Sequence, residues 1–361
     1  MKPLPDTQSV QAGAWQQWFV GIAAVGVTLL ILVQGRVFLV PLAIAVLLFS
    51  LTSAARDRIA RLRVGSVRVP NWLASLIGIV FIMAAMLTVF TIIAGQIDAV
   101  IAAGPAYVAR GQELVTSVFA WLGHDVATAV VAAIEDIDLP AYVRALAGSA
   151  GYTMATAILI LLYVGFLFAE RAHFTSKMAN LFPEADRAAR FERLVESITR
   201  SVHRYILIKT VVSVLTGLLV YVVLQAFGLE FAETWALLAV FLNFIPNVGS
   251  IVATALPTLA ALVQFDSWTP VVLIFTFIGL IQFSVGNLLE PNLMGRSLNL
   301  SPFAIILSLT FWGAIWGIVG MFLAVPIMVV TMIACSHVPS LHPIAVLLSR
   351  DGIPTPEEDA E

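Results

Sequence analysis

Two asparagines beside a proline and a glycine interrupt a long uncharged stretch of the chain. Asn243, Pro246, Asn247 and Gly249 lie within residues 234–265, which contain no Asp, Glu, Lys or Arg. Pro246 removes a backbone donor and Gly249 permits a tight turn. An unsatisfied polar group in hydrocarbon costs several kcal/mol, so the amides must meet water, protein or a solute. We expect a solute-binding tip; the alternative is a kink whose Asn side chains bond the local backbone.

A carboxylate, Glu290, ends the next apolar segment immediately before Pro291, where a helix tends to stop. At helical spacing Gln282, Asn287 and Glu290 fall within roughly a 140° arc, so we expect one polar face toward the protein interior. A carboxylate near the membrane boundary that faces the interior is a candidate ion or proton site. The alternative is an interfacial Glu290 paired with Arg296.

Glycines recur in the last apolar stretch. Gly313 and Gly317 have the spacing of close helix–helix packing, and Gly320 follows one turn later. The same glycines are also suited to the tip of a helical hairpin. The expected hairpin or hinge positions are Pro291, Gly295, Gly313, Gly317, Gly320 and Pro326.

The segments that carry these residues are too long for single membrane crossings. About 20 apolar residues cross a bilayer, whereas residues 234–265 and 297–349 are longer and uncharged. Each is either one kinked crossing or a re-entrant hairpin. The hairpin arrangement places Asp266 outside and Arg296 inside, and charge placement together with length favours it. Residues 206–265 and 267–336 would then form two units of opposite orientation, as in many secondary transporters.

The composition predicts an all-α polytopic membrane protein with about eight membrane segments. Of 361 residues, 60% are hydrophobic and 11% charged, whereas soluble domains are near 45–50% apolar and about 25% charged. The net charge of −3 suggests no nucleic-acid partner. The single cysteine excludes an internal disulfide, and the histidines lack metal-ligand spacing. No HExxH, GxSxG or Walker motif occurs, so we expect no enzyme activity, cofactor or metal.

Charge distribution orients the chain. The basic stretches 54–70 and 170–209 are expected in the cytoplasm and the acidic stretch 95–148 outside, which places both termini inside. A helix from Pro183 is expected to run unbroken into the span Ile206–Phe227. The expected regions are 1–94 (tail and three spans, with the loop 54–70), 95–148 (extracytoplasmic amphipathic helices), 149–205 (fourth span and basic helix), 206–335 (transport core) and 336–361 (acidic, proline-containing tail).

Three short sequence motifs resemble those of a known protein family. They are Ile245-Pro246-Asn247-Val248-Gly249, the run Glu290-Pro291 to Gly295-Arg296-Ser297, and Ala324-Val325-Pro326. The chain resembles the autoinducer-2 exporter family of bacterial inner-membrane transporters, in which an aromatic residue is usual at the position of Asn247. The resemblance implies ATP-independent transport of a small molecule or ion. Some members are linked to autoinducer-2 export and others to Na⁺(Li⁺)/H⁺ antiport. It also implies homo-oligomers, with pentamers among them.

Together these observations predict a secondary transporter or exporter in the bacterial inner membrane, with alternating access around the broken-helix tips. Its partners would be the lipid bilayer and a small-molecule or ion substrate coupled to H⁺ or Na⁺. The alternatives are a Na⁺(Li⁺)/H⁺ antiporter, a membrane scaffold without transport and a passive oligomeric channel. The expected substrate or ion site comprises Asn243, Pro246, Asn247, Gly249, Gln282, Asn287, Glu290 and Arg296.

Overall fold

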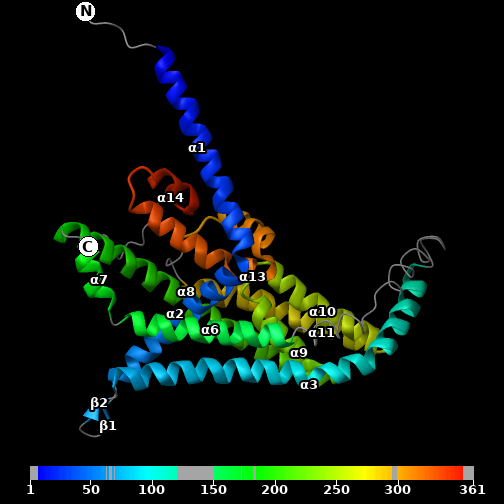
Figure 1. Ribbon diagram of the computed structural model, residues 1–361. Coiled ribbons are helices and arrows are strands. Elements are labelled where there is room, and N and C mark those ends of the chain that lie inside the picture. Colours follow the sequence, from blue (N-terminus) through cyan, green and yellow to red (C-terminus); the bar gives the residue numbers. More distant parts are fainter. Residues whose placement is uncertain are drawn as a thin grey trace, which may run out of the picture.

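The protein is a bundle of long helices (Figure 1). The structure, a computed structural model, describes residues 7–61, 63–64, 67–68, 70–119, 150–171, 173–181, 184–294 and 299–352. The elements are α1 (Thr7–Gln34), α2 (Arg36–Arg61), β1 (Arg63–Val64), β2 (Val67–Arg68), α3 (Asn71–Phe119), α6 (Ala150–Arg171), α7 (Phe174–Leu181), α8 (Ala185–Phe227), α9 (Ala232–Leu242), α10 (Val248–Gln264), α11 (Trp268–Ser284), the π-helical turn η1 (Val285–Leu289), α12 (Glu290–Met294), α13 (Pro302–Ser336) and α14 (His342–Leu348).

The prediction of an all-α polytopic membrane protein is confirmed. Within the described residues, six helices are long and apolar enough to cross a membrane, and three shorter apolar helices accompany them. The only strands among these residues are β1 and β2, which pair over two residues each. The six long segments are Arg36–Ser53, Trp72–Gln96, Thr153–Arg171, Asp186–Phe227, Trp268–Met294 and Pro302–Ser336; the shorter ones are Phe19–Gln34, Ala232–Leu242 and Val248–Gln264.

Two helices cross the expected region boundaries. α3 has 49 residues and runs through position 95 to Phe119, so the predicted third span and the start of the acidic region form one helix. α8 has 43 residues, in agreement with the helix expected to continue unbroken into the fifth span. The remainder of the expected extracytoplasmic region, 120–148, lies outside the described residues.

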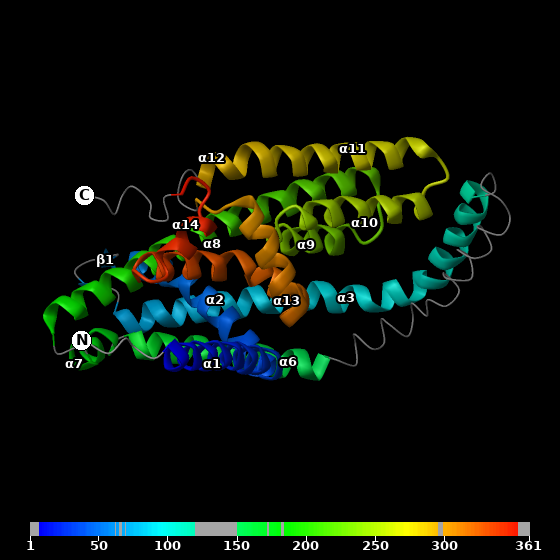
Figure 2. The same cartoon turned by 90° about the horizontal axis from the view of Figure 1, so that it is seen from above.

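The first broken segment is a hairpin of two helices. α9 ends at Leu242 and α10 begins at Val248, and α10 lies beside α9 and α11 (Figure 2). The two ends of the hairpin are joined by Gln264. Its Nε2 donates to the carbonyl of Gly228 at 2.8 Å, and its Oε1 accepts from the backbone N–H of Glu230 at 2.7 Å. The chain therefore leaves the segment at the level at which it entered.

The second broken segment is also folded back on itself. The helical course of α13 is interrupted at Gly317, where φ is 64° and ψ is −143°. The hydroxyl of Ser308 donates to the carbonyl of Ala324 at 2.9 Å, although 16 residues separate them. A continuous helix would hold these groups about 24 Å apart. The two arms, 302–316 and 318–336, thus form a hairpin, whereas its entry into a bilayer stays a prediction.

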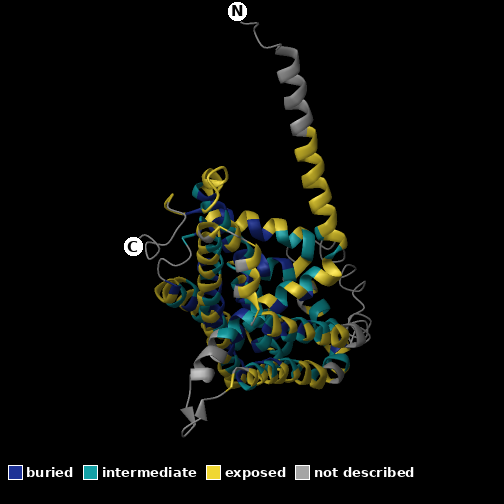
Figure 3. Ribbon diagram, turned by 60° about the vertical axis from the view of Figure 1, so that its left-hand side comes forward, coloured by how far each residue is buried: buried dark blue, intermediate teal, exposed yellow. Residues whose placement is uncertain are grey.

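The remaining packing arranges α8 and α11 as antiparallel partners. The start of the α8 span contacts Glu290 beyond α11, and Phe227 at the other end of α8 lies 6.2 Å from Phe277, between ring centroids. A separate apolar core joins α2, α3 and α6. α1 projects from this bundle, and its described side chains are mostly exposed (Figure 3). The last third of the chain thus forms one packed unit of two helix-plus-hairpin halves.

Candidate functional site

The tip of the first hairpin packs against both arms of the second hairpin. Phe244, in the break between α9 and α10, lies 4.4 Å from Phe322 of α13, measured between ring centroids. Next to it, buried Ile245 packs with Leu309 and Ala324, one from each arm of the second hairpin. Segments that are both interrupted in sequence are therefore brought together in space. This convergence defines the candidate site.

In both hairpins a glycine allows the backbones of the two arms to approach closely. Gly249 begins the returning arm of the first, and a Cβ there would overlap with the carbonyl oxygen of Leu242 at the end of α9. Gly320 holds the corresponding position in the second, where a Cβ would overlap with the carbonyl oxygen of Trp312. A hydrogen atom is the only substituent that allows such an approach of two backbones. Both glycines therefore allow the two arms of their hairpin to approach closely.

A row of buried polar groups on α8 runs toward the first tip. Asn243 is 4% exposed, and its Nδ2 donates to the hydroxyl of Ser213 at 3.0 Å. Ser213 and the next polar residue of the row, Thr216, are both fully buried. The hydroxyl of Thr216 donates to the carbonyl of Val212, so its hydrogen bond is made within α8. Asn243 is thus held by a neighbouring helix, and the expectation of a purely local kink does not describe it.

The other residues of the first tip lie differently. Asn247 is exposed, and its φ of 61° and ψ of −54° are close to those of the rare classic γ-turn. Pro246 is half-buried beside it. The carbonyl of Pro246 accepts from the N–H of Val248 at 2.7 Å, which closes the turn. Asn247 therefore presents its amide at the surface of the tip, whereas Asn243 points into the protein.

Glu290 has a partner that the sequence reasoning missed. The Nζ of Lys209, on α8, lies 2.5 Å from the Oε1 of Glu290, with 3% of the Lys209 side chain and 20% of the Glu290 side chain exposed. We had placed Lys209 in the basic cytoplasmic stretch. Its position inside the span Ile206–Phe227 was the available signal, because a charged residue within a span is usually paired and functional. Arg296, the partner considered from sequence, and Gly295 lie outside the described residues.

The polar face expected on α11 is partly formed. Gln282 is buried, and both polar atoms of its side chain lack a hydrogen-bond partner among the described residues. Asn287, in contrast, is exposed, and its Nδ2 donates to the carbonyl of Phe283 in its own helix at 3.1 Å. Asn287 marked the far edge of the predicted arc, about 140° from Gln282. The prediction of a shared interior face is wrong for Asn287.

The second tip reaches the first helix. The indole Nε1 of Trp316 donates to the carbonyl of Leu32 near the end of α1 at 3.0 Å. Carbonyls in the last turn of a helix have no partner within it, so this bond satisfies one of them. Gly313 packs against Met321 of the opposite arm, and Pro326 is buried within the returning arm. Pro291 lies exposed in α12.

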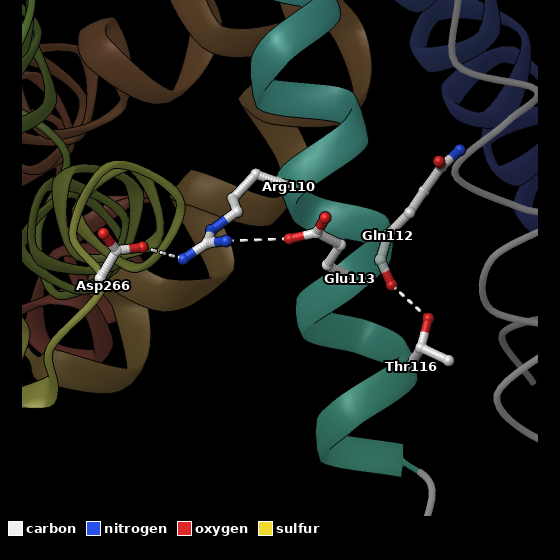
Figure 4. A network of polar contacts seen from close by, with 5 residues as sticks. All are labelled: Arg110, Gln112, Glu113, Thr116 and Asp266. Carbon is white, nitrogen blue, oxygen red and sulfur yellow. Dashed lines mark hydrogen bonds and ion pairs between the residues drawn. The ribbon is translucent and has the colours of Figure 1, made fainter.

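An ionic network joins the far end of α3 to the base of the first hairpin (Figure 4). Arg110 pairs with Asp266, in the connection between α10 and α11, and with Glu113 one turn along α3. The Tyr107 hydroxyl donates to Glu230 at 3.2 Å. Burial of the phenol and then the nearby Glu230 carboxylate raise the pKa of Tyr107 to about 12. Asp266 thus lies beside the far end of α3, whereas its side of the membrane stays a prediction.

No group of three or more His, Cys, Asp or Glu side chains that could hold a metal ion occurs in the described part of the chain. The site consists instead of amides, hydroxyls and one ion pair set among apolar helices. Side chains of these kinds can bind a polar group or an ion.

The fold and this site define a multi-pass membrane protein of the transporter class, with converging helical hairpins. The family model of AI-2E family transporters matches residues 21–340, and the chain belongs to this family. The chain is 37% identical to the AI-2 transport protein TqsA of Escherichia coli over 197 residues, 54% of this chain and 56% of that protein. It is 34% identical to a putative transport protein of Borreliella burgdorferi over 226 residues, 61% and 62% of the two chains. A putative transport protein of Haemophilus influenzae shares 34% over 206 residues, 57% and 59%. These matches span less than two thirds of each relative.

Proposed function

We propose that the chain is a secondary transporter that moves a small polar solute or ion across the bacterial inner membrane without ATP. The packing of the first hairpin tip against the second hairpin carries this proposal, because irregular backbone at membrane depth is tolerated only where protein or a water-filled cavity surrounds it. Helix breaks of this kind form the substrate sites of many secondary transporters. Family membership and the similarity to an AI-2 transport protein of E. coli support the same conclusion.

The proposed solute path passes between the tips and along the polar row of α8. Asn243 and Ser213 supply an amide and a hydroxyl. The amide of Gln282, which has no hydrogen-bond partner among the described residues, supplies a further donor and acceptor. Asn247 offers its amide at the tip surface. Alternating access would move the unit 206–335 against the other spans, with the hairpins entering from opposite faces. Both termini would be cytoplasmic, and the chain would assemble as a homo-oligomer.

Transport by purified protein in proteoliposomes tests this proposal. Autoinducer-2, the solute named for the E. coli relative, is loaded and its exit is followed, and a parallel set with an internal pH dye detects Na⁺ or Li⁺ exchange for protons. We expect Asn243→Ala and Glu290→Gln to slow transport roughly tenfold or more, because each removes a buried partner. Asn247→Ala is expected to weaken solute binding at the tip.

Asn287→Ala is the matched control, because this amide is exposed and bonds only its own helix. It should transport at the wild-type rate. If Asn243→Ala, Asn247→Ala and Glu290→Gln fold normally and match the wild-type rate, the site assignment is wrong. If the wild type moves neither solute nor cations while it remains folded, the scaffold alternative gains support. A solute-independent leak would instead favour a passive channel.

A further inference from the structure

The ion pair of Lys209 and Glu290 joins two elements that alternating access would have to separate. Lys209 belongs to α8. Glu290 is the first residue of α12, which follows α11 and η1. The pair carries no net charge, but either group alone would be an uncompensated charge in an apolar setting, which is strongly destabilising. The contact therefore holds α12 against α8 as long as both groups are ionised.

Glu290 points toward Lys209 because of the π-helical turn η1. Its backbone N–H bonds the carbonyl of Val285, five residues earlier, instead of the usual four. In a regular α-helix Glu290 would lie about 80° around the axis from Gln282. The extra residue in η1 turns Glu290 back toward the side of the helix that carries buried Gln282. Pro291 has no N–H to donate, which lowers the cost of an irregular turn at this position.

The surroundings of Glu290 contain few groups that could replace Lys209. α11, η1 and α13 carry no acidic or basic residue. Tyr205, one turn before Lys209 on α8, has a buried hydroxyl with no hydrogen-bond partner among the described residues, and the Glu290 charge acts on it. Cys335 is buried in the same apolar cluster as Tyr205. Within the described residues, Lys209 is therefore the cation that compensates Glu290.

We propose that Lys209 and Glu290 form a charge lock with η1 as its hinge. While Glu290 is ionised, the lock holds α12 against α8. Uptake of a solvent proton by the partly exposed carboxylate replaces the ion pair by a neutral carboxyl group and releases α12. The Lys209 ammonium then donates to the free hydroxyl oxygen of Tyr205, and η1 is free to become α-helical. The role of the lock in transport rests on the proposed function, but the lock itself is a property of the folded chain.

Hydrogen exchange measured by mass spectrometry on the full chain in nanodiscs tests the lock without any transported solute. The peptide of interest covers residues 285–294, and rates are corrected at each pH for intrinsic exchange. In the wild type we expect protection to fall as the pH is lowered and Glu290 takes up a proton. Glu290→Gln should exchange faster at neutral pH by roughly tenfold to a hundredfold, the worth of a charge-assisted hydrogen bond, and should show no pH dependence.

Variants of Lys209 separate the lock from ordinary packing. Lys209→Arg keeps the charge and should retain the wild-type pH profile, whereas Lys209→Met should lose it. If Lys209→Met alone does not fold, the neutral double variant Lys209→Met/Glu290→Gln serves in its place, with low and pH-independent protection expected. Glu233→Gln, on α9 and bonded to Gln225, is the matched carboxylate control and should behave as the wild type.

The proposal is overturned if Glu290→Gln or the double variant keeps the wild-type protection or its pH dependence. Its failure is distinguishable from failure of the transport proposal. If the wild-type protein transports its solute while Glu290→Gln keeps the wild-type exchange profile, only the lock is removed. A lock that responds as expected in a protein that moves no solute removes only the transport assignment.

Discussion

The packing of Gly249 against Leu242 leads to a sharp prediction for the alanine variant. Gly249 is buried in the first turn of α10, and a Cβ there would overlap with the carbonyl oxygen of Leu242. The obstructing atom belongs to the backbone of α9, so no side-chain rotation relieves the overlap and the two arms must move apart. Overpacking of a well-packed core costs about 1–3 kcal/mol, and backbone obstruction places Gly249→Ala toward the upper end.

Gly279→Ala is the matched control for this variant. Gly279 lies in the interior of α11, and a Cβ there meets no atom within 4 Å. Alanine favours a helix over glycine by about 1 kcal/mol, so Gly279→Ala is expected to be neutral or stabilising. Two variants with the same chemical change are therefore expected to shift stability in opposite directions or by clearly different amounts.

The assay is unfolding of the purified protein in mixed detergent micelles, with thermal melting as a second measurement. Each kcal/mol corresponds to about 2–4 °C in a soluble domain of 150–250 residues, so Gly249→Ala should melt several degrees below Gly279→Ala. The same opening should displace Asn243 from Ser213 and lower transport. Equal stability of Gly249→Ala and Gly279→Ala would refute the reasoning, because the two backbones would then not approach as closely as described.

Three further predictions follow from other parts of the fold. Gly317→Ala should cost about 1–3 kcal/mol in the same unfolding assay despite open space around it, because the backbone angles there suit glycine alone; an unchanged stability would contradict this. Arg110→Ala should cost less than about 1 kcal/mol, since Asp266 is 92% exposed, and melting in low and high salt should show the loss shrinking as salt rises. The phenol of Tyr107 should ionise with a pKa of about 12, and Glu230→Gln should lower that pKa; pH-difference absorbance against a Tyr107→Phe reference measures both.

Much of the fold of residues 206–335 was predictable from the lengths of the apolar segments and from their helix-breaking residues alone. A stretch such as 234–265 cannot be one straight span, and its Pro246 and Gly249 mark where the chain turns. The second hairpin followed from the same argument, but the position of its turn did not. Three glycines compete for that role, and only the backbone angles single out Gly317. Length and composition thus locate a hairpin, whereas packing selects the residue at its tip.

The site was less accessible to sequence reasoning, for two physical reasons. The orientation of Asn287 and Glu290 depends on the π-helical turn η1, which a constant 100° per residue does not represent. The partner of Glu290 depends on a contact between α8 and α12 across 81 residues of sequence. The positive-inside rule assigned Lys209 to the cytoplasm by its charge, although hydrophobic neighbours placed it within a span. Charge and hydrophobic surroundings here predict different locations for Lys209. Its burial shows that it belongs to an ion pair and does not mark the cytoplasmic side of the membrane.

The charge lock and the glycine contacts have different roles within residues 206–335. Gly249 and Gly320 bring backbone against backbone inside each hairpin, so each hairpin is expected to move as a rigid piece. The contact of Lys209 with Glu290 instead joins α8 to the end of the α11 arm, and it can be broken by a single proton. A movement between two conformations requires rigid elements and a contact between them that can be broken. Gly249→Ala should therefore weaken the hairpin at every pH, whereas Glu290→Gln should loosen α12 at neutral pH and remove its response to pH.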